Sequence, residues 1–456
     1  MISRPARTSS RTSRFAAIET LYRLERSRSP VKPIFDAVAE ECSLPGPERA
    51  LAMKLIYGIL RQREYLELLL ARLCSRPAAR LDPLVYWALA VGLYQLFCLD
   101  RIPESAAVNE TVNALKAAGL KKHLHGFVNG VLRAATRQRG SLPGPEMTLP
   151  SGRPLLNHPE WLTARWASRF GQEEMERICL ANNREPQLVL RVNSPRCDRL
   201  QLADRFHRTG IAAHHGRYAP DSLILPEYQG SVTSLPGFEE GCFQVQDEAA
   251  QLAVLLLGPF MQEGKYLDAC AGLGGKTSHL LQLVTPGSRV VAVEPEPGRR
   301  LLLEENLGRL FPDYSLSISP SSLQEYCRES DLRFDGVLVD APCSGTGVTG
   351  RHPDIRWNRS SEDPARYQLT QLDILEHAAD RVAPAGILVY ATCSLESEEN
   401  EEVIQQFLKR HQDFSSTDCS RYLPESAGIF VKGNFFCPHP TGSIDGFFAA
   451  RLQRKK

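Results

Sequence analysis

The feature that most restricts the fold is a regular alternation of strand-type and helix-length segments after Gly264. Short runs rich in valine, leucine and tyrosine recur at YLDAC, RVVAVE, YSLSI, FDGVLVD and GILVYAT. Helix-length segments separate them, among them Pro297–Leu310, Asp363–Val382 and Ser397–Arg410. This alternation is typical of βαβ units, in which parallel strands form one sheet with helices on both faces. We therefore predict an α/β fold that binds ligands outside the carboxyl ends of its strands.

The first part of the chain has a different periodicity. Within about residues 10–140, apolar residues recur at helical spacing, and no alternating strand pattern interrupts them. Proline and glycine then cluster in GSLPGPEMTLPSGRP, where no period survives. A chain of 456 residues is too long for one ordinary core. We predict an all-α domain over residues 1–140, a linker over 141–154, a small α+β segment over 155–240 and the α/β domain over 241–456.

The sequence argues against a membrane, secreted or metal-binding protein. Its longest apolar stretches, Tyr86–Leu99 and Leu252–Met261, are shorter than the roughly 20 residues of a membrane span. The start MISRPARTSSRTSRF has no apolar core and is therefore no secretory signal. The twelve cysteines include no C-x-x-C pair, which disfavours a zinc module or a disulfide framework. We expect a cytoplasmic protein without a metal.

Positive charge is concentrated at the front of the chain. Residues 1–140 contain 22 Lys+Arg and 12 Asp+Glu, a net charge of +10. The remainder contains 54−22 = 32 basic and 53−12 = 41 acidic residues, a net charge of −9. A basic domain on an otherwise acidic chain indicates a nucleic-acid partner, although a solvated basic face without a ligand would look the same.

A glycine-rich turn joins the first predicted strand of the α/β part to a helix. In LDACAGLGGKTSHLLQL the glycines let a backbone approach a ligand, and the helix start offers free N–H groups. A phosphate-binding loop requires glycine where Cys270 stands, and a dinucleotide fingerprint requires glycine where Thr277 stands. The remaining candidate ligand is S-adenosylmethionine. Glu294 ends the next strand, where a carboxylate accepts hydrogen bonds from a ribose diol or, more commonly for an isolated acid, caps a helix.

Two of the twelve cysteines stand out by their position. Cys343 and Cys393 each follow a predicted strand and precede a serine, and Asp340 lies just before Cys343. Most buried cysteines are inert core residues. Two thiols and an acid beside a methyl donor nevertheless match one reaction, because carbon 5 of cytosine becomes nucleophilic only after a thiolate adds to carbon 6. From the residues alone, either cysteine is a candidate for that thiolate.

With these residues in hand, the chain resembles the bacterial cytosine-5 ribosomal RNA methyltransferases of the RsmB-like, or Sun/Fmu, type, which act on 16S rRNA. The resemblance covers nearly the whole chain. It rests on VQDEAAQL, LDACAGLGGKT, DAPCSGTGVTGRHPDIRW, VYATCSLESEEN and DGFFAARL, which stand in the order of that family. In the front domain, RIPESAAVNETVNALK and FVNGVLR resemble the NusB-type helical RNA-binding fold.

The resemblance implies a Rossmann-like domain that binds S-adenosylmethionine, and it implies roles for single residues. Cys393 is then the nucleophile, Cys343 assists release of the methylated product, and Asp340 is catalytic. The implied cofactor-binding residues are Cys270, Ala271, Gly272, Leu273, Gly274, Gly275, Lys276, Glu294 and Asp340. The implied partner is 16S rRNA, naked or in a partly assembled small ribosomal subunit, and we expect the protein to act as a monomer.

Three positions depart from the family pattern. Gly272-Leu273 replaces the usual Ala-Pro, Glu294 replaces an aspartate, and Ser317–Leu323 lacks the carboxylate that the family places near the adenine. A non-catalytic RNA-binding factor is therefore an alternative, and a nicotinamide-dependent oxidoreductase is a less favoured one. The presence of both thiols, Asp340 and the Gly-Gly-Lys turn favours the methyltransferase.

Basic residues of the front domain are the candidate phosphate contacts, although each one also fits an ordinary surface charge. These candidates are Arg4, Arg7, Arg11, Arg14, Lys121, Lys122, Arg133 and Arg137. After the first cysteine motif, RHPDIRW offers Arg351 and Trp357 to a flipped base or its phosphates. Base flipping is expected because carbon 6 cannot be reached within a base-paired stack.

Overall fold

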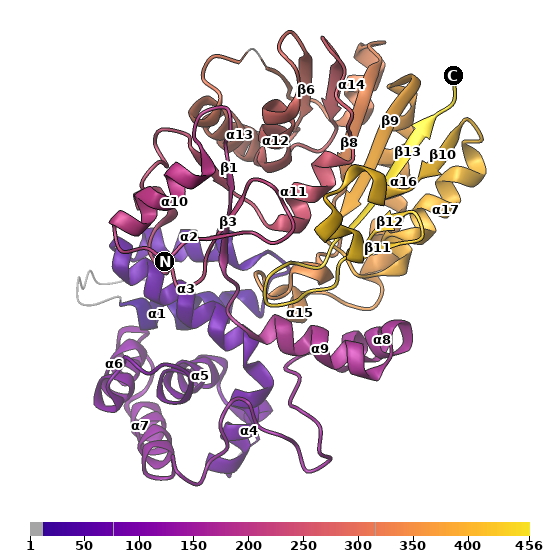
Figure 1. Cartoon of the computed structure of the whole chain (residues 1–456). Helices are drawn as coiled ribbons and strands as arrows, with labels where there is room; N and C mark the ends of the chain where they lie inside the picture. The colour runs from indigo at the N-terminus through magenta and orange to yellow at the C-terminus, as the bar shows by residue number, and fades with distance from the viewer. Residues whose placement is uncertain (1–11, 76, 315) are drawn as a thin grey trace, which may run out of the picture. The chain divides into compact units, whose positions relative to one another are not determined.

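The computed structural model describes residues 12–75, 77–314 and 316–456, and its chain divides into two compact units. Unit 1 comprises Met1–Glu185 together with Thr349–Arg359. Unit 2 comprises Pro186–Val348 together with Ser360–Lys456. The chain therefore leaves unit 2 after the first cysteine motif, contributes a short segment to unit 1, and returns before the second motif (Figure 1).

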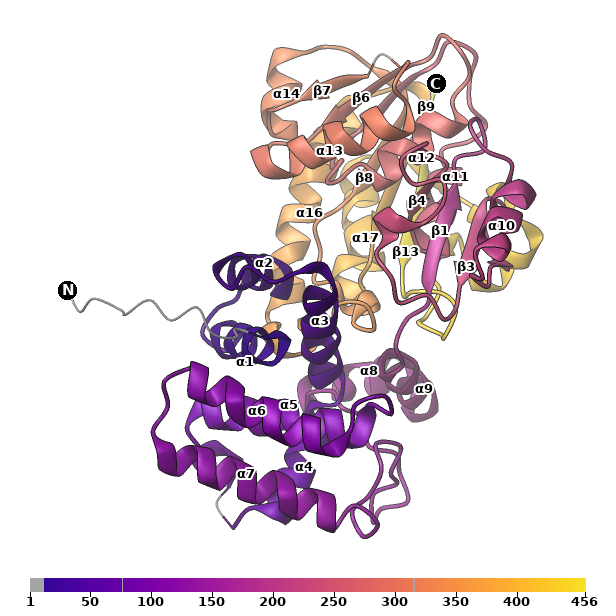
Figure 2. The same cartoon turned by 90° about the vertical axis from the view of Figure 1, so that its left-hand side faces the viewer.

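The front of unit 1 is all-α, as the helical spacing predicted (Figure 2). Its helices are α1 (Ser13–Leu24), α2 (Val31–Glu41), α3 (Gly46–Arg61), α4 (Arg63–Leu73), α5 (Pro83–Cys98), α6 (Glu104–Ala117) and α7 (Lys122–Arg137). α5 is central and contacts α1, α3, α4, α6 and α7. It begins where it does because Pro83 occupies the first turn and the Asp82 carboxylate accepts the Leu84 N–H at 2.9 Å.

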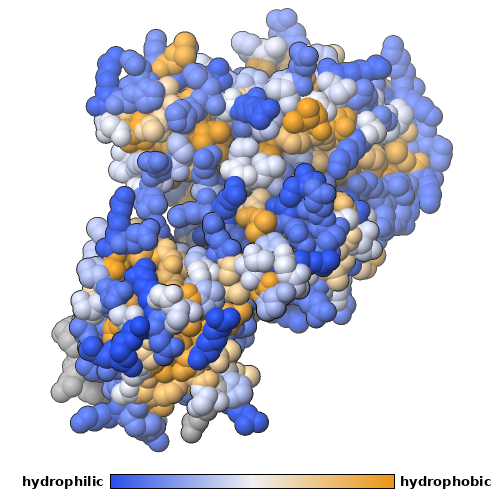
Figure 3. Space-filling model, turned by 60° about the horizontal axis from the view of Figure 1, so that its bottom comes forward, coloured by the Kyte–Doolittle hydropathy of each residue, from blue (hydrophilic) through white to orange (hydrophobic). Residues whose placement is uncertain are grey.

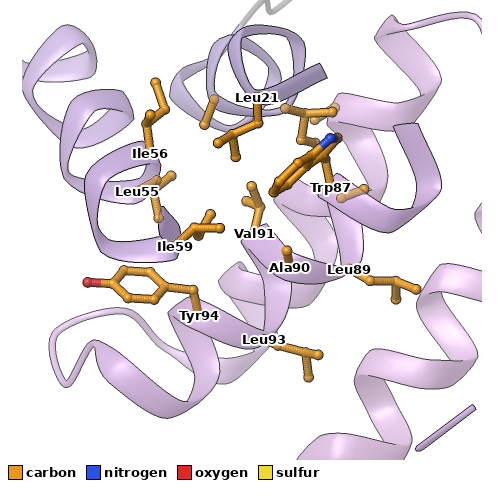
Figure 4. Packing of buried hydrophobic residues seen from close by; sticks show 14 of the residues in the cluster. Leu21, Leu55, Ile56, Ile59, Trp87, Leu89, Ala90, Val91, Leu93 and Tyr94 are labelled. Carbon is orange, nitrogen blue, oxygen red and sulfur yellow. The ribbon is translucent and has the colours of Figure 1, made fainter. Parts of the chain in front are cut away.

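The core of unit 1 lies where α1 and α3 meet α5. Figure 4 shows Leu21 of α1 and Ile59 of α3 directed toward Trp87 and Val91 of α5. All four side chains are buried. A Cβ added to Gly58 would lie 2.0 Å from the Tyr94 hydroxyl oxygen, so a larger residue there would require the Tyr94 side chain to move.

Unit 1 continues with α8 (Glu160–Phe170) and α9 (Gln172–Asn183), which pack on each other. The returning segment Thr349–Arg359, with the short helix α15 (Ile355–Asn358), is bonded into this unit. Arg356 is fully buried and donates to the Asn157 carbonyl at 3.0 Å and to the Asn183 Oδ1 at 2.7 Å. This segment is therefore a structural part of unit 1 and no surface loop.

The first part of unit 2 is a small antiparallel sheet with the strand order β2-β3-β1-β4. Its strands are β1 (Leu188–Val192), β2 (His214–His215), β3 (Ser222–Leu225) and β4 (Phe243–Val245). Helix α10 (Arg199–Arg208) starts after Asp198, whose carboxylate accepts the Leu200 and Gln201 N–H groups. Leu202 and Phe206 of α10 pack with the sheet in one cluster.

The large sheet of unit 2 has the order β11-β12-β13-β9-β8-β5-β6-β7, with β10 paired to β13. The predicted strands are all present and parallel, as β5 (Lys265–Asp268), β6 (Arg289–Val293), β7 (Ser317–Ser319), β8 (Phe334–Asp340) and β9 (Val382–Thr392). The antiparallel strands are β10 (Phe414–Thr417), β11 (Val431–Lys432), β12 (Phe435–Phe436) and β13 (Phe448–Arg454). The predicted α/β class is confirmed, but the sheet is mixed, because β13 adds to β9 in the opposite direction.

Helices cover both faces of the large sheet, because successive strand residues point to opposite sides. Val290, Ala292, Val389 and Ala391 share one core with the helices α11 (Glu248–Leu255), α12 (Gly275–Leu283) and α13 (Pro297–Leu310). Val291, Val293, Leu388 and Tyr390 share the other core with the helices α14 (Leu323–Glu329), α16 (Asp363–Asp380) and α17 (Glu401–Arg410). The carboxyl ends of the strands are left as the open edge.

Helix length and surface hydropathy both bear on membrane insertion. Among the residues that the structure describes, no helix is both long enough and apolar enough to cross a bilayer. On the face seen in Figure 3, hydrophilic side chains surround smaller hydrophobic areas. The same described residues contain no group of His, Cys, Asp or Glu side chains that could hold a metal ion.

Candidate active site

The two cysteine motifs meet at the carboxyl edge of the large sheet. β8 and β9 are parallel neighbours in a register that pairs Asp340 with Ala391, so the loops after them start side by side. The Sγ atoms of Cys343 and Cys393 are 3.2 Å apart. A backbone hydrogen bond joins the two cysteine loops, because the Gly347 N–H donates to the Cys393 carbonyl at 2.9 Å. A Cβ on Gly347 would lie 2.3 Å from the Gly446 carbonyl oxygen, so this contact requires glycine.

The environment of Cys343 favours its neutral form. Its hydrogen bond with Cys393 and the burial of its sulfur raise the pKa of Cys343 well above that of an ordinary thiol. Cys343 is therefore protonated at neutral pH and suited to hold or deliver a proton.

Asp340, at the end of β8, forms an ion pair with Lys276 at the start of α12. The Lys276 Nζ lies 2.7 Å from the Asp340 Oδ2, and the lysine side chain is only 12% exposed. Burial opposes the charge of Lys276, but the charge and the hydrogen bond of Asp340 outweigh it, so the pKa of Lys276 is raised. The Lys276 ammonium also lies 5.2 Å from the centre of the Phe447 ring. The pair thus joins the glycine-rich turn to the cysteine loops.

The glycine-rich turn joins β5 to α12 through two residues with left-handed backbone, Gly272 (φ 55°) and Gly274 (φ 84°). A Cβ on Gly274 would lie 2.6 Å from the Leu303 side chain, whereas a Cβ on Gly272 or Gly275 would meet no atom within 4 Å. The turn is thus packed on one side and open on the other. This open backbone at a helix N-terminus is a cradle of the kind that S-adenosylmethionine requires.

Buried carboxylates hold the turn and the neighbouring strand end. Asp268 is fully buried and accepts the Thr277 hydroxyl at 2.7 Å, and burial raises the pKa of Asp268 to about 6. Glu294 follows β6, is 4% exposed, and accepts the Glu296 N–H at 2.9 Å. The Ala271 N–H donates to the Val293 carbonyl at 3.0 Å, so the turn runs alongside the strand end that carries Glu294.

The segment that lacks the family carboxylate, Ser317–Leu323, uses its polar groups for local structure. Ser322 caps α14 in a capping box with Glu325. The Ser322 hydroxyl lies 2.8 Å from the Glu325 Oε2 and is thereby engaged in the cap. Ser322 is therefore a poor replacement for the missing acid.

Sequence reasoning missed Glu399 and Phe447 as site residues. Glu399 is buried behind the two cysteine loops and accepts hydrogen bonds from Ser344 and Ser394. Both residues lie in motifs that carried the family resemblance, VYATCSLESEEN and DGFFAARL, which was the available signal. No local pattern singles out either one, because the contact of Glu399 with Ser344 and that of Phe447 with Lys276 join segments distant along the chain.

The candidate RNA contacts fall into separate groups. Arg4, Arg7 and Arg11 lie outside the described residues. Arg14 turns inward, where its Nε donates to the Gln95 Oε1 at 3.0 Å. The remaining candidates, Lys121, Lys122, Arg133 and Arg137, are exposed on or just before α7.

Arg351 and Trp357 belong to the segment that returns to unit 1. The Trp357 Nε1–H donates to the Leu60 carbonyl at 2.8 Å, and the Arg63 guanidinium lies 4.9 Å from the Trp357 ring centre. Arg351 is half-buried. The structure therefore gives Trp357 a packing role in unit 1, and contacts of these two residues with RNA stay predictions.

Solved structures share this fold. The crystal structure of PH0851 superposes with a TM-score of 0.75 at 21% sequence identity, over 99% of this chain and 100% of that chain. The crystal structure of NSun6 from Pyrococcus horikoshii with SFG superposes with a TM-score of 0.57 at 20% identity, over 65% of this chain and 98% of that chain. At these identities the likeness shows the fold alone.

A sheet of this order, with an open glycine turn after its central strand and an acid after the next, defines the class of Rossmann-like, S-adenosylmethionine-dependent methyltransferases. Residues 254–453 match the family described as 16S rRNA methyltransferase RsmB/F, residues 158–232 match its ferredoxin-like domain, and residues 11–137 match the NusB family. The Yersinia enterocolitica protein named ribosomal RNA small subunit methyltransferase B is 37% identical over 418 residues, covering 91% of this chain and 92% of that protein. The chain belongs to the RsmB/F family of rRNA methyltransferases.

Proposed function

We propose that the chain methylates carbon 5 of a cytosine in 16S rRNA, with S-adenosylmethionine as methyl donor and Cys393 as covalent nucleophile. The observation that carries this proposal is the 3.2 Å separation of the Cys343 and Cys393 sulfurs at the ends of adjacent parallel strands. The nearby Asp340–Lys276 ion pair links these thiols to the glycine-rich turn. Two thiols and an acid thus lie together, beside the turn that is proposed to hold the methyl donor.

The chemistry of cytosine explains why thiols are required. Addition of a thiolate to carbon 6 breaks the 5,6 double bond and gives an enamine whose carbon 5 attacks an electrophilic methyl group. S-Adenosylmethionine supplies that methyl group when bound. Carbon 5 then carries both a methyl group and a proton, so the proton must leave before the sulfur–carbon 6 bond breaks and the ring is restored.

The surroundings of the two thiols favour Cys393 as the nucleophile. Lys276 interacts electrostatically with Cys393, and a cation at this position stabilises a thiolate. Cys343 instead has a raised pKa and keeps its proton. The family resemblance implies the same order of roles. In this proposal Cys393 forms the bond to carbon 6, and Cys343 takes part in proton transfer as the methylated product is released.

Asp340 is assigned to the cytosine ring at N3. A carboxyl group there, held protonated or bridging a proton to N3 when the base is bound, stabilises the adduct as the thiolate adds. Lys276, at 2.7 Å, neutralises the Asp340 carboxylate whenever no base is bound. The ion pair therefore keeps an acid at the open edge without an uncompensated buried charge.

The proposed cofactor site comprises Cys270 to Lys276, Glu294 and Asp340. The backbone of the turn faces the amino-acid part of the cofactor, and Glu294 accepts hydrogen bonds from the ribose diol. SFG, which accompanies the solved NSun6 structure, is an analogue of S-adenosylmethionine and supports this ligand. The absence of a carboxylate over Ser317–Leu323 predicts weak recognition of the adenine.

The proposed RNA partner is 16S rRNA, naked or in an assembling small subunit, as the name of the Yersinia relative supports. The proposed phosphate contacts in unit 1 are the exposed basic residues at α7. Lys122, Arg133 and Arg137 lie within about 60° of one another around the helix axis. No acidic residue occurs between Lys122 and Arg137 to offset their charge.

The proposal is tested by labelling small-subunit RNA with S-adenosylmethionine that carries an isotopic methyl group. Digestion to nucleosides should place the label in 5-methylcytidine, and no other nucleoside should be labelled. RNA that contains 5-fluorocytidine should trap a denaturant-stable adduct, since fluorine at carbon 5 cannot leave as a proton does. Peptide mass mapping of that adduct should find the RNA on Cys393. Label in another nucleoside, or no label, would contradict the proposal.

A further inference from the structure

Glu399 lies behind the two cysteine loops, fully buried. Its Oε1 accepts the Ser344 N–H at 2.7 Å and the Gln371 Nε2–H at 3.1 Å. Its Oε2 accepts the Ser394 hydroxyl at 2.5 Å and also the Ser344 hydroxyl. Ser344 directly follows Cys343, and Ser394 directly follows Cys393. One carboxylate is thus bonded to the residue after each thiol.

The carboxylate is the side chain that suits this position. Its two oxygens accept all of these hydrogen bonds, whereas a glutamine would offer one oxygen and would turn an N–H₂ group toward two donors. The serine hydroxyls lie 3.1 Å apart, so the bonds converge in one buried network. Gln371 of α16 extends it, because its Nε2 also donates to the Pro342 carbonyl at 2.9 Å.

Glu399 is itself held to the end of β9. The Tyr390 hydroxyl donates to the Glu399 carbonyl at 2.7 Å. The next residue, Asn400, accepts the Thr392 hydroxyl at 2.6 Å and donates to the Ser394 carbonyl at 2.9 Å. The carboxylate is therefore fixed relative to the strand that carries Cys393, and it reaches from there to the loop that carries Cys343.

The two thiols also differ in the charged groups that lie near them. Burial raises the pKa of Glu399, and the hydrogen bonds from Ser344, Ser394 and Gln371 act in the opposite direction. The charge of Glu399 contributes to the raised pKa of Cys343. Lys276 provides the opposite charge on the side of Cys393. The negative charge of Glu399 thus favours the neutral form of Cys343.

We propose that Glu399 is a positioning residue that sets the spacing of the two thiols through Ser344 and Ser394. The role of Glu399 in setting this spacing is inferred only from its hydrogen bonds to Ser344 and Ser394. Its consequence for catalysis rests on the proposed function, because two thiols act on one ring only if their loops keep a fixed register. Glu399 touches neither substrate nor cofactor in this account.

The test measures the thiol pair with a reagent that does not depend on methyl transfer. Phenylarsine oxide binds two neighbouring thiols at once, forming two arsenic–sulfur bonds and releasing its oxygen as water with both thiol protons. Protection of Cys343 and Cys393 from alkylation, read by peptide mass mapping, reports binding at this pair. We expect Glu399→Gln to weaken that binding by about tenfold or more, because the two sulfurs lose their common support.

Glu398→Gln is the matched control. The same change is made one residue earlier, at a half-buried side chain that accepts the Ser397 hydroxyl at 3.3 Å. It should leave arsenical binding within about twofold of the wild type, as expected of a surface substitution. Cys393→Ala provides the single-thiol baseline.

Kinetics give the second readout. Glu399→Gln should lower kcat by about tenfold or more while the KM values for RNA and S-adenosylmethionine stay within about twofold. Should Glu399→Gln lower the unfolding temperature too far for use, Ser394→Ala keeps the Glu399 carboxylate and removes its bond to the Cys393 loop, together with the contacts of the Ser394 hydroxyl with Ser344 and Thr346. This variant should weaken arsenical binding in the same direction. Unchanged arsenical binding in the folded variants would overturn the proposal. Weakened binding in an enzyme that does not methylate cytosine would overturn the proposed function and leave the positioning role intact.

Discussion

At the open edge of unit 2 the reactive groups are bonded to one another. The Cys343 and Cys393 sulfurs are 3.2 Å apart, and the Lys276 ammonium is 2.7 Å from the Asp340 carboxylate. The basic groups on α7 of unit 1 are instead exposed to water. Within the described part of the chain, the Arg133 side chain donates a hydrogen bond to the Asn129 Oδ1 of the same helix, at 3.1 Å. Buried electrostatic interactions are strong, whereas water and salt screen exposed ones.

The site in unit 2 therefore depends on each of its groups, whereas the surface of α7 depends on the sum of its charges. Removing one buried partner leaves the other unpaired in a medium of low dielectric constant, so single substitutions in unit 2 should have large effects that do not add. Exposed charges on α7 act through the total field, so single substitutions there should have small effects that nearly add. Each prediction below challenges one side of this comparison.

The largest expected effect is that of Cys393→Ala. Without the proposed nucleophile, methyl transfer should fall by about 10⁴-fold or more, and no adduct with 5-fluorocytidine RNA should form. Cys343→Ala should instead accumulate a protein–RNA adduct with ordinary RNA, because the thiol assigned to proton transfer during release is gone. Denaturing gels and methyl-transfer rates measure both outcomes. The reverse pattern, with the adduct in Cys393→Ala, would exchange the roles of the two thiols.

Asp340→Asn should have the next largest effect. The substitution removes the acid proposed to act at N3 and leaves Lys276 without its ion-pair partner. General acid catalysis contributes about 10²-fold to 10⁴-fold, so the rate of adduct formation should fall within that range. RNA affinity, measured by filter binding, should stay within about twofold. A large loss of RNA affinity with an unchanged rate in the bound complex would move Asp340 from chemistry to binding.

The sequence was informative where structure depends on local pattern. The five parallel strands, the helical front of unit 1 and the glycine turn each have a period or a spacing that short-range physics dictates, and all were predicted. Cys343 and Cys393 were found because both follow strands, and parallel strands end at the same edge. Their proposed order of use could not be predicted from the residues alone, because the positions of Lys276 and Glu399 near the two loops emerge only in the folded chain.

Long-range contacts explain what sequence reasoning did not predict. β11 and β12 have two residues each and therefore no period, and β13 was quoted only as part of a family motif. The bonds from Ser344 to Glu399 span 55 residues of chain. Arg356 stands in RHPDIRW, a segment expected near the substrate, yet it is buried in unit 1 among carbonyl groups. Its partners Asn157 and Asn183 lie 199 and 173 residues away along the chain, so the local sequence gives no sign of such burial.

Asp268→Asn should have a moderate effect on stability. It tests how far burial controls the ionisation of the Asp268 carboxyl group. Burial raises the pKa of Asp268 to about 6, above its unfolded value. The contribution of Asp268 to the free energy of unfolding is therefore fully present below pH 4, where the carboxyl group is protonated in both states, and it is lost as the pH rises through 6. The wild type should therefore lose up to about 3 kcal/mol relative to the neutral variant between pH 4 and pH 7. Denaturant unfolding of both proteins across this range measures the difference. A constant difference would mean that Asp268 is as ionised in the folded state as in the unfolded chain.

The smallest single effects should come from the basic residues of α7. Lys122→Ala, Arg133→Ala and Arg137→Ala should each weaken RNA binding by no more than about fivefold and lower the slope of log affinity against log salt by about 0.7 to 0.9. Lys32→Ala on α2 is the control, since Lys32 is already paired with Asp36 at 2.8 Å. The triple variant should approach the sum of the single changes, because exposed charges that bind separate phosphates act independently. A single substitution that abolished binding would show instead a specific pocket on α7, and the contrast with the sheet edge of unit 2 would fail.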